Sequence, residues 1–241
     1  MTISAAADES TDATPTGTTD RPCRLDLDLV RYVHKGIRSA LFAVTTAAGR
    51  LDPADGIGLE VLAAEIRDVA RLLADHARAD DEHIQPALTT DGVGRAIADG
   101  RDRLESSVAR IVDRVTLARS VAGDERRRSI HELYLELAAF TGAYLAQQDH
   151  EERVVAPALS ERLGAEGVAD LFHRIVPDMR PDELTRCMVA TLPALDVDDR
   201  CEFLDGLRSA LTADAFDAVW SLASSLLPDE DLAPLAARLR R

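Results

Sequence analysis

The chain has 241 residues, and its 43 acidic and 28 basic side chains give a formal net charge of −15 at pH 7. This length fits one domain, or one domain with a smaller appendage. So acidic a chain is poorly suited to bind nucleic acid, where affinity comes from Lys and Arg at the phosphates, or an anionic membrane surface. Apolar residues make up 46% of the sequence but aromatic residues only 4%. The core must therefore come mainly from Leu, Ala, Val and Ile, which favours packed helices over sheets.

Neither a membrane-spanning segment nor a secretory signal is visible in the sequence. No stretch approaches the roughly 18 apolar residues of a membrane helix, and the N-terminus lacks the basic-then-apolar order of a signal peptide. We therefore expect a cytoplasmic protein. The cysteines, Cys23, Cys187 and Cys201, lie far apart without CxxC spacing. This spacing argues against a disulfide or a thiolate zinc site, and free thiols are expected.

The order of polar and apolar residues along the chain predicts an all-α protein. Residues 1–22 are polar and nearly devoid of large apolar side chains, which is typical of a disordered tail. Apolar residues then recur at spacings of three and four in long runs, over residues 25–49, 57–88, 94–121 and 125–159. Short connections force neighbouring helices to run in opposite directions, so an antiparallel four-helix bundle is predicted over residues 23–163. Shorter amphipathic runs separated by prolines predict a small helical extension over residues 164–241.

The ends of the second and fourth runs look like copies of one another. Residues 76–88 read HARADDEHIQPAL and residues 147–159 read QQDHEERVVAPAL, so both segments finish Pro-Ala-Leu. Aligning the first and third runs by their apolar steps brings His34 opposite Arg101. Two helix pairs therefore look like repeats of one unit.

The repeat places polar side chains where they can act together, because residues i and i+4 of a helix face the same way. His76 and Asp80 can point at one spot, and Glu151 is the equivalent of Asp80 in the second copy. At a rise of about 1.5 Å per residue, the candidate polar side chains fall within about one helical turn in height. They are His34, His76, Asp80, Arg101, Gln147 and Glu151.

At these positions the sequence resembles the hemerythrin-like family, the HHE cation-binding four-helix bundles, over roughly residues 25–160. The matching residues are His34, His76, Asp80, Pro86, Glu151 and Pro157. Members of this family hold two non-haem irons bridged by carboxylates, and they bind O2 or nitric oxide or respond to redox state. The resemblance implies that His34 and His76 are terminal ligands of one iron, with Asp80 and Glu151 as the bridging carboxylates.

The sequence departs from the family at the second iron. The places where the third and fourth helices should supply histidines hold Arg101 and Gln147. A guanidinium at Arg101 could replace the positive charge of the missing cation, since buried carboxylates need a partner. The remaining groups then suit a mononuclear Fe(II), Mn(II) or Zn(II) site with open positions. Complete loss of metal would instead leave a charged pocket for an anion or for proton transfer.

Neighbouring residues receive weaker predictions. His150, one turn from Gln147, is a candidate to replace the missing histidine, although a surface role is the stronger expectation. Tyr144 either packs in the core or reaches the pocket with its phenol. Asp81, Glu82 and Glu152 are expected on a solvated face, and His83 in a structural or surface role.

The leading functional hypothesis is an iron-binding protein that handles O2 or a related small oxidant, as a redox sensor or an oxidative catalyst. Its metal ligands would be His34, His76, Asp80 and Glu151, with Arg101, Gln147 and Tyr144 as further pocket residues. One alternative is a metal-free enzyme that performs acid–base chemistry on a small organic substrate in specialised biosynthesis. Another is an interaction module whose C-terminal helices recruit a partner.

Overall fold

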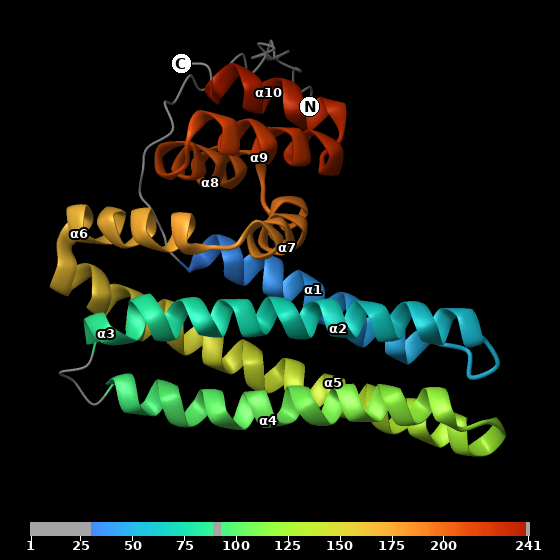
Figure 1. Cartoon of the computed structure of the whole chain (residues 1–241). Coiled ribbons are helices and arrows are strands. Elements are labelled where there is room, and N and C mark those ends of the chain that lie inside the picture. The colour runs from blue at the N-terminus through green and yellow to red at the C-terminus, as the bar shows by residue number, and fades with distance from the viewer. Residues whose placement is uncertain (1–29, 89–92, 240–241) are drawn as a thin grey trace, which may run out of the picture.

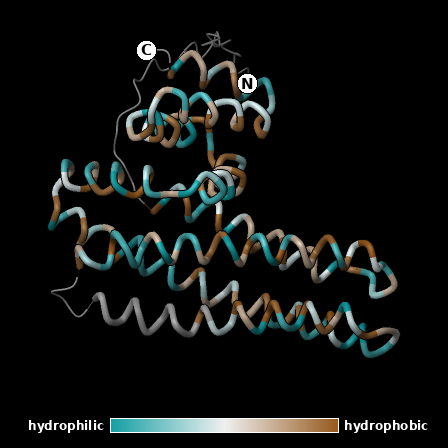
Figure 2. The backbone as a smooth tube through the Cα atoms, viewed as in Figure 1, coloured by the Kyte–Doolittle hydropathy of each residue, from teal (hydrophilic) through white to brown (hydrophobic). Residues whose placement is uncertain are grey.

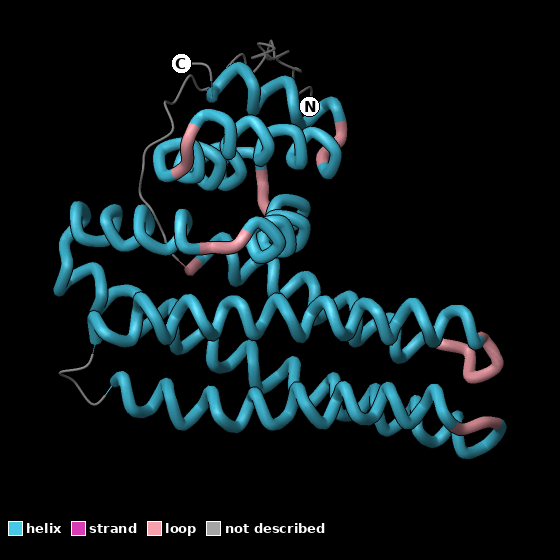
Figure 3. Tube along the Cα trace, in the orientation of Figure 1, coloured by secondary structure: helices cyan, strands magenta, loops and turns pink. Residues whose placement is uncertain are grey.

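The computed structural model describes residues 30–88 and 93–239, and within these ranges the regular elements are all helices (Figures 1 and 3). The prediction of an all-α protein is confirmed for this part of the chain. The predicted disordered tail, residues 1–22, lies outside the described residues, as do residues 89–92.

Four long helices pack against one another. They are α1 (Arg31–Arg50), α2 (Gly56–Ala79), α4 (Val93–Ser120) and α5 (Gly123–His150). Contacts join α1 to α2, α2 to α4, α4 to α5 and α5 back to α1, so each long helix touches two others (Figure 1). Their shared core is aliphatic, with Ile37, Leu41 and Leu133 among its fully buried side chains. Hydrophobic and hydrophilic residues alternate along the parts of these helices that Figure 2 colours by hydropathy, as an amphipathic packing requires.

Local sequence signals explain the helix boundaries. The carboxylate of Asp55 caps α2 by accepting a hydrogen bond of 2.8 Å from the backbone N–H of Gly58. Gly123 opens α5 with a φ of 58°, a left-handed conformation that favours glycine. Gly164, with a φ of 69°, has a non-helical backbone and produces a kink in the helix over residues Ala156–Asp178.

Between the long helices and their continuations lie short π-helical segments. The first, η1 (Asp80–Ile84), joins α2 to α3 (Gln85–Leu88). The second, η2 (Glu151–Val155), joins α5 to α6 (Ala156–Asp178). The predicted runs 57–88 and 125–159 are therefore helical throughout, but each contains a change of helix type.

The C-terminal part folds into shorter helices around a second core, to which Tyr32 of α1 and Phe172 of α6 also contribute. They are α7 (Pro181–Thr191), the 3-10 turn η3 (Leu192–Ala194), α8 (Val197–Ala210), α9 (Ala213–Leu226) and α10 (Asp229–Leu239). We call residues 181–239 the C-terminal unit. Phe172 and Phe203 are buried in its core, and Phe216 and Trp220 pack against it. Figure 1 shows α7 between the long helices and the remaining helices of the unit. None of the helices among the described residues is long and apolar enough to cross a membrane.

The expectation of free thiols is correct for Cys187 and wrong for Cys201. Cys187 is free and buried, whereas Cys201 is disulfide-bonded. Cys23 lies outside the described residues. Spacing along the sequence could not decide this, because folding can bring together cysteines that are far apart in the chain.

Cys187 should resist iodoacetamide in the native protein at pH 8 and react fully after unfolding in urea. Burial raises the pKa of its thiol to about 11, and only a weak contact with the Thr191 hydroxyl opposes this. Roughly one thiol in a thousand is then ionised at pH 8, and the thiolate is the reactive form. Peptide mass mapping measures the labelling. Cys201 is an internal control, because its disulfide should block labelling in both states until a reductant is added. Rapid native labelling of Cys187 would contradict the prediction.

Candidate metal centre

Asp80 and Glu151 occupy equivalent backbone positions, because each is the first residue of a π-helical segment. The backbone N–H of Gln85 donates to the carbonyl of Asp80, and that of Ala156 donates to the carbonyl of Glu151. A proline follows each closing residue. Proline has no N–H and its ring crowds the carbonyl four residues earlier, so a widened turn just before it relieves the conflict. The sequence repeat is thus also a repeat of backbone geometry, of a kind often found at functional sites.

His34, on α1, is completely buried, with a relative exposure of 0%. Its Nδ1 lies 3.0 Å from Oε1 of Glu152, and its Nε2 lies 3.3 Å from Oε2 of Glu151. Both ring nitrogens face a carboxylate, but only Nδ1 has hydrogen-bond geometry, so in a neutral ring Nδ1 carries the proton and Nε2 presents its lone pair. Among the described residues Nε2 has no hydrogen-bond partner with suitable geometry.

His76, on α2, approaches His34 edge-on, with ring centroids 5.3 Å apart and an interplanar angle of 88°. His34, His76 and Glu151 each offer one ligand atom, and these atoms lie within 4.8 Å of one another. Metal–ligand bonds of about 2.0–2.2 Å hold two ligand atoms at most about 4.4 Å apart, so side-chain rotations that draw these atoms closer would bring all of them to one ion. Imidazole nitrogens with a carboxylate oxygen form a donor set suited to zinc or iron.

Glu151 is poised to be an ionised ligand. Burial raises the pKa of its carboxyl, but the adjacent His34, the nearby His76 and the hydrogen bond from Gln147 outweigh burial and lower the pKa overall. Nε2 of Gln147 donates to Oε1 of Glu151 at 2.9 Å. At neutral pH Glu151 is therefore a fixed carboxylate beside two imidazoles.

The carboxylate of Glu152 supports His34 from the other side of its ring. It contacts Nδ1 of His34, and the same oxygen lies 2.9 Å from Nη2 of Arg38. Partners of this kind fix the tautomer and orientation of a metal-binding histidine. Glu152 is not the solvated residue that the sequence suggested, since its side chain is 27% exposed and faces α1. The sequence signal that could have indicated this position is Arg38, one turn after His34, because one carboxylate can contact both of these side chains.

The other residues singled out in the sequence are placed as follows. Asp80 is buried, and its Oδ2 lies 3.7 Å from Nε2 of His76, outside the group of three ligand atoms. Tyr144 is partly buried and packs on the ring of Phe140, with centroids 5.7 Å apart. His150 is exposed. Arg101 belongs to α4, but its side chain lies outside the described part of the structure.

Gln148 is a site neighbour that the sequence reasoning missed. Its side chain is fully buried, and within the described residues neither its amide nitrogen nor its amide oxygen has a hydrogen-bond partner. It lies near the end of α5 and precedes Glu151 by three residues and Glu152 by four, so it is about one helical turn from both carboxylates. A glutamine in a polar run carries no sequence signal that would separate it from its exposed neighbours.

A second group of possible ligands is Glu82, His83 and Asp178. Both carboxylates are exposed, and Arg78 already contacts Glu82 and lies 3.6 Å from Asp178. Nε2 of His83 lies 3.2 Å from an oxygen of Asp178. The guanidinium of Arg78 therefore already supplies a positive charge to these carboxylates. The contacts of the group join η1 to the end of α6.

Comparison of the chain with family models, with curated proteins and with solved structures found no match. What the described residues establish is an all-helical protein that carries His and Glu side chains grouped as a candidate metal-binding site.

Proposed function

We propose that this chain is a hemerythrin-like four-helix bundle that binds one iron ion through His34, His76 and Glu151 and handles O2 or a related small oxidant. The observation that supports this most is the placement of Nε2 of His34, which is buried and 3.3 Å from a Glu151 oxygen while Nδ1 is engaged by Glu152. Either role, redox sensor or oxidative catalyst, uses the same site.

The electrostatics of His34 favour a cation between His34 on α1 and Glu151 on η2. In the neutral ring a lone pair faces a carboxylate oxygen, and two electron-rich atoms at that separation repel one another. A metal ion removes the repulsion by accepting both lone pairs. Glu151 is kept ionised by its neighbours and so needs such a charge in a buried place.

The donor set and its surroundings fit a non-haem metal with open positions. Three ligands, or four with Asp80 beside His76, leave room for a small molecule. A bound iron would supply the redox chemistry of O2 activation or sensing. The protein residues hold this environment: Glu152 fixes the His34 tautomer, Gln147 orients Glu151, and burial limits access of water.

The centre should be mononuclear. The second iron of the family needs histidines where this chain has Arg101 and Gln147. Gln147 already donates its amide hydrogen bond to Glu151, which orients a carboxylate and does not bind a second ion. His150, the nearest candidate to replace it, is exposed.

A metal-free enzyme is the second candidate, and the same contacts of His34 favour it. A protonated ring between Glu151 and Glu152 would also be satisfied electrostatically, and it could serve as a general acid for an organic substrate. Turnover that survives exhaustive chelation would support this candidate, and a strict iron requirement would count against it.

Elemental analysis of the purified chain, with ultraviolet–visible spectra taken aerobically and after reduction, tests the proposed function. We expect about one metal ion per chain, mainly iron, and spectra that change on reduction. A chelated and dialysed sample is the baseline. Absence of stoichiometric metal, also after incubation with Fe(II), would defeat the proposal. Absorption typical of an oxo-bridged iron pair would overturn the mononuclear assignment.

A further inference from the structure

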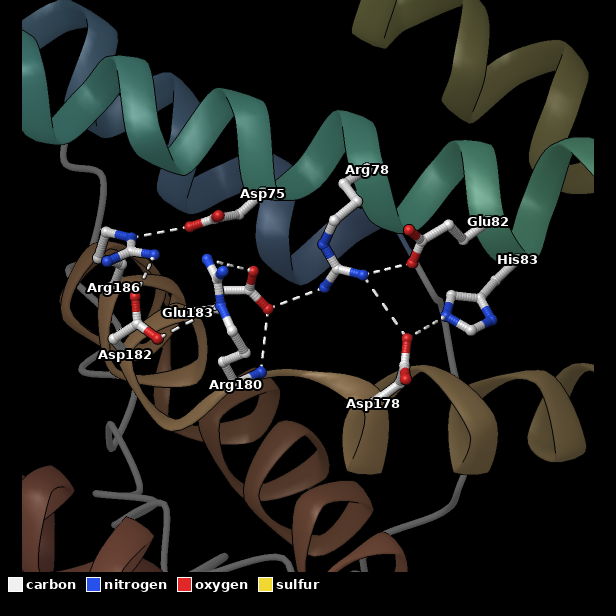
Figure 4. A network of polar contacts seen from close by, with 9 residues as sticks. All are labelled: Asp75, Arg78, Glu82, His83, Asp178, Arg180, Asp182, Glu183 and Arg186. Carbon is white, nitrogen blue, oxygen red and sulfur yellow. Dashed lines mark hydrogen bonds and ion pairs between the residues drawn. The ribbon is translucent and has the colours of Figure 1, made fainter.

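Helix α7 of the C-terminal unit lies across both helices that carry the histidines. It contacts α1 and α2, and it also contacts α9 and η3 within its own unit. Its contacts with α1 and α2 fall beside His34 and His76. Figure 4 shows the polar part of this junction.

On α1 the contact is a close approach of backbones at Gly36, two residues after His34. A Cβ atom at Gly36 would lie 2.7 Å from Cα of Thr191, the last residue of α7. Real Cβ atoms essentially never come so near to backbone, so only glycine permits this packing. Helices α1 and α7 are therefore in direct backbone contact near the height of His34, with no empty space between them.

On α2 the contacts are ion pairs that flank His76. Nε of Arg186 donates to Oδ2 of Asp75 at 2.7 Å, and Nη2 of Arg78 donates to Oε2 of Glu183 at 2.8 Å (Figure 4). Glu183 is 2% exposed, and it also accepts a hydrogen bond of 3.0 Å from the backbone N–H of Arg180. A buried, fully partnered carboxylate of this kind fixes the position of α7 against α2.

Ion pairs also join α1 to α8. Arg31 lies 3.0 Å from a carboxylate oxygen of Asp199, and Lys35 pairs with the other oxygen of the same carboxylate. These basic residues stand on either side of His34 in the sequence. A displacement of α1 at His34 must therefore be shared with both α7 and α8.

We infer that α7 couples the metal centre to the C-terminal unit: its docking sets the spacing of His34 and His76, and metal binding in turn stabilises that docking. The inference rests on the proposed function in requiring a metal at this site, and it adds the C-terminal unit as the element that reads or adjusts occupancy. The coupling is reciprocal by thermodynamic necessity, so either end can serve as input.

Titration of the full-length chain with Zn(II), in competition with a chelating dye, tests the inference. We expect Glu183→Gln to weaken Zn(II) binding by about five-fold or more, within the range typical of coupling between sites. Glu60→Gln is the matched control, because Glu60 lies on α2 and pairs with Arg119 of α4, at the end of α2 that is far from α7. It should change the affinity less than about two-fold. Asp75→Asn provides a second, milder variant if Glu183→Gln does not fold.

Hydrogen exchange gives a readout that loss of stability alone would not produce. Zn(II) should slow amide exchange in residues 181–210 of the wild-type chain, and this slowing should shrink in Glu183→Gln. Binding of Zn(II) by the wild type with no effect on these amides, or equal affinity in wild type and both α7 variants, would overturn the coupling alone. Absence of any Zn(II) or Fe(II) binding by the wild type would overturn the proposed function and the coupling together.

Discussion

The His76→Ala protein should contain no stoichiometric metal and should bind added Zn(II) or Fe(II) at least about 100-fold more weakly than the wild type. Loss of a residue that only supports a ligand costs about 10–100-fold, and loss of a ligand itself should cost no less. His76 supplies one of the three clustered ligand atoms. Its removal leaves one imidazole and the carboxylates of Glu151 and Asp80, an incomplete donor set that should hold a divalent ion far more weakly. Elemental analysis and chelator competition measure the effect.

His150→Ala is the matched control for this experiment. His150 is an exposed histidine at the end of α5, next in sequence to Glu151, and it is not part of the ligand group. Its loss should leave metal content unchanged. A metal content in His76→Ala equal to that of the wild type would refute the assignment of His76. Loss of metal in His150→Ala alone would mean that the exposed histidine turns inward to bind.

Stability measurements give an independent check on His76. Metal that binds only the folded chain should raise the free energy of unfolding by about 2.7 kcal/mol when its free concentration is 100 times the dissociation constant. The wild type should show this gain in urea unfolding, and His76→Ala should not. Equal gains in both proteins would place the metal elsewhere on the chain.

Hydrophobic periodicity predicted the positions of the long helices well. The predicted run 94–121 corresponds to α4 at Val93–Ser120, and the predicted run that starts at residue 125 corresponds to α5, which begins at Gly123. Such runs are readable because apolar spacing follows the helical period and glycine marks the turns. The same method could not see the π-helical segments. One extra residue in a single turn changes the spacing of apolar residues over too short a stretch to be recognised. Only the proline after each segment marked the place in the sequence.

Proximity within the site was more predictable than the partners of each side chain. Height along parallel or antiparallel helices can be counted from the sequence, and His34, His76 and Glu151 do lie together. Rotation about each axis is harder, because one residue turns a side chain by about 100°. Adjacent Glu151 and Glu152 illustrate this: both were near the right height, but the sequence did not show that Glu152 faces Nδ1 of His34. The disulfide of Cys201 and the docking of α7 depend on tertiary contacts that no local pattern encodes.

The junction between α7 and α2 carries the second large expected effect. Arg78→Ala should lower the free energy of unfolding by about 2 kcal/mol at pH 7 in urea titrations. Breaking a buried ion pair usually costs about 3–5 kcal/mol. A smaller loss is expected here because the Arg78 side chain is 33% exposed and Arg180 remains 2.9 Å from Glu183. Arg119→Ala, which breaks the exposed pair with Glu60 at the far end of α2, is the control and should have a much smaller effect.

The pH dependence of this loss distinguishes an electrostatic cause from a packing defect. Burial raises the pKa of Glu183, but the backbone N–H of Arg180 and the side chain of Arg78 outweigh it and lower the pKa below the usual range. A carboxyl whose folded pKa is lowered adds stability above its unfolded pKa of about 4.3, and that stability disappears as the pH falls through the folded pKa. Removing Arg78 raises the folded pKa, so the gap between wild type and Arg78→Ala should be full at pH 7 and narrow progressively below about pH 4. A gap that stays constant down to pH 3 would instead mean that Arg78 acts through the packing of its aliphatic stem, because packing does not respond to protonation of Glu183.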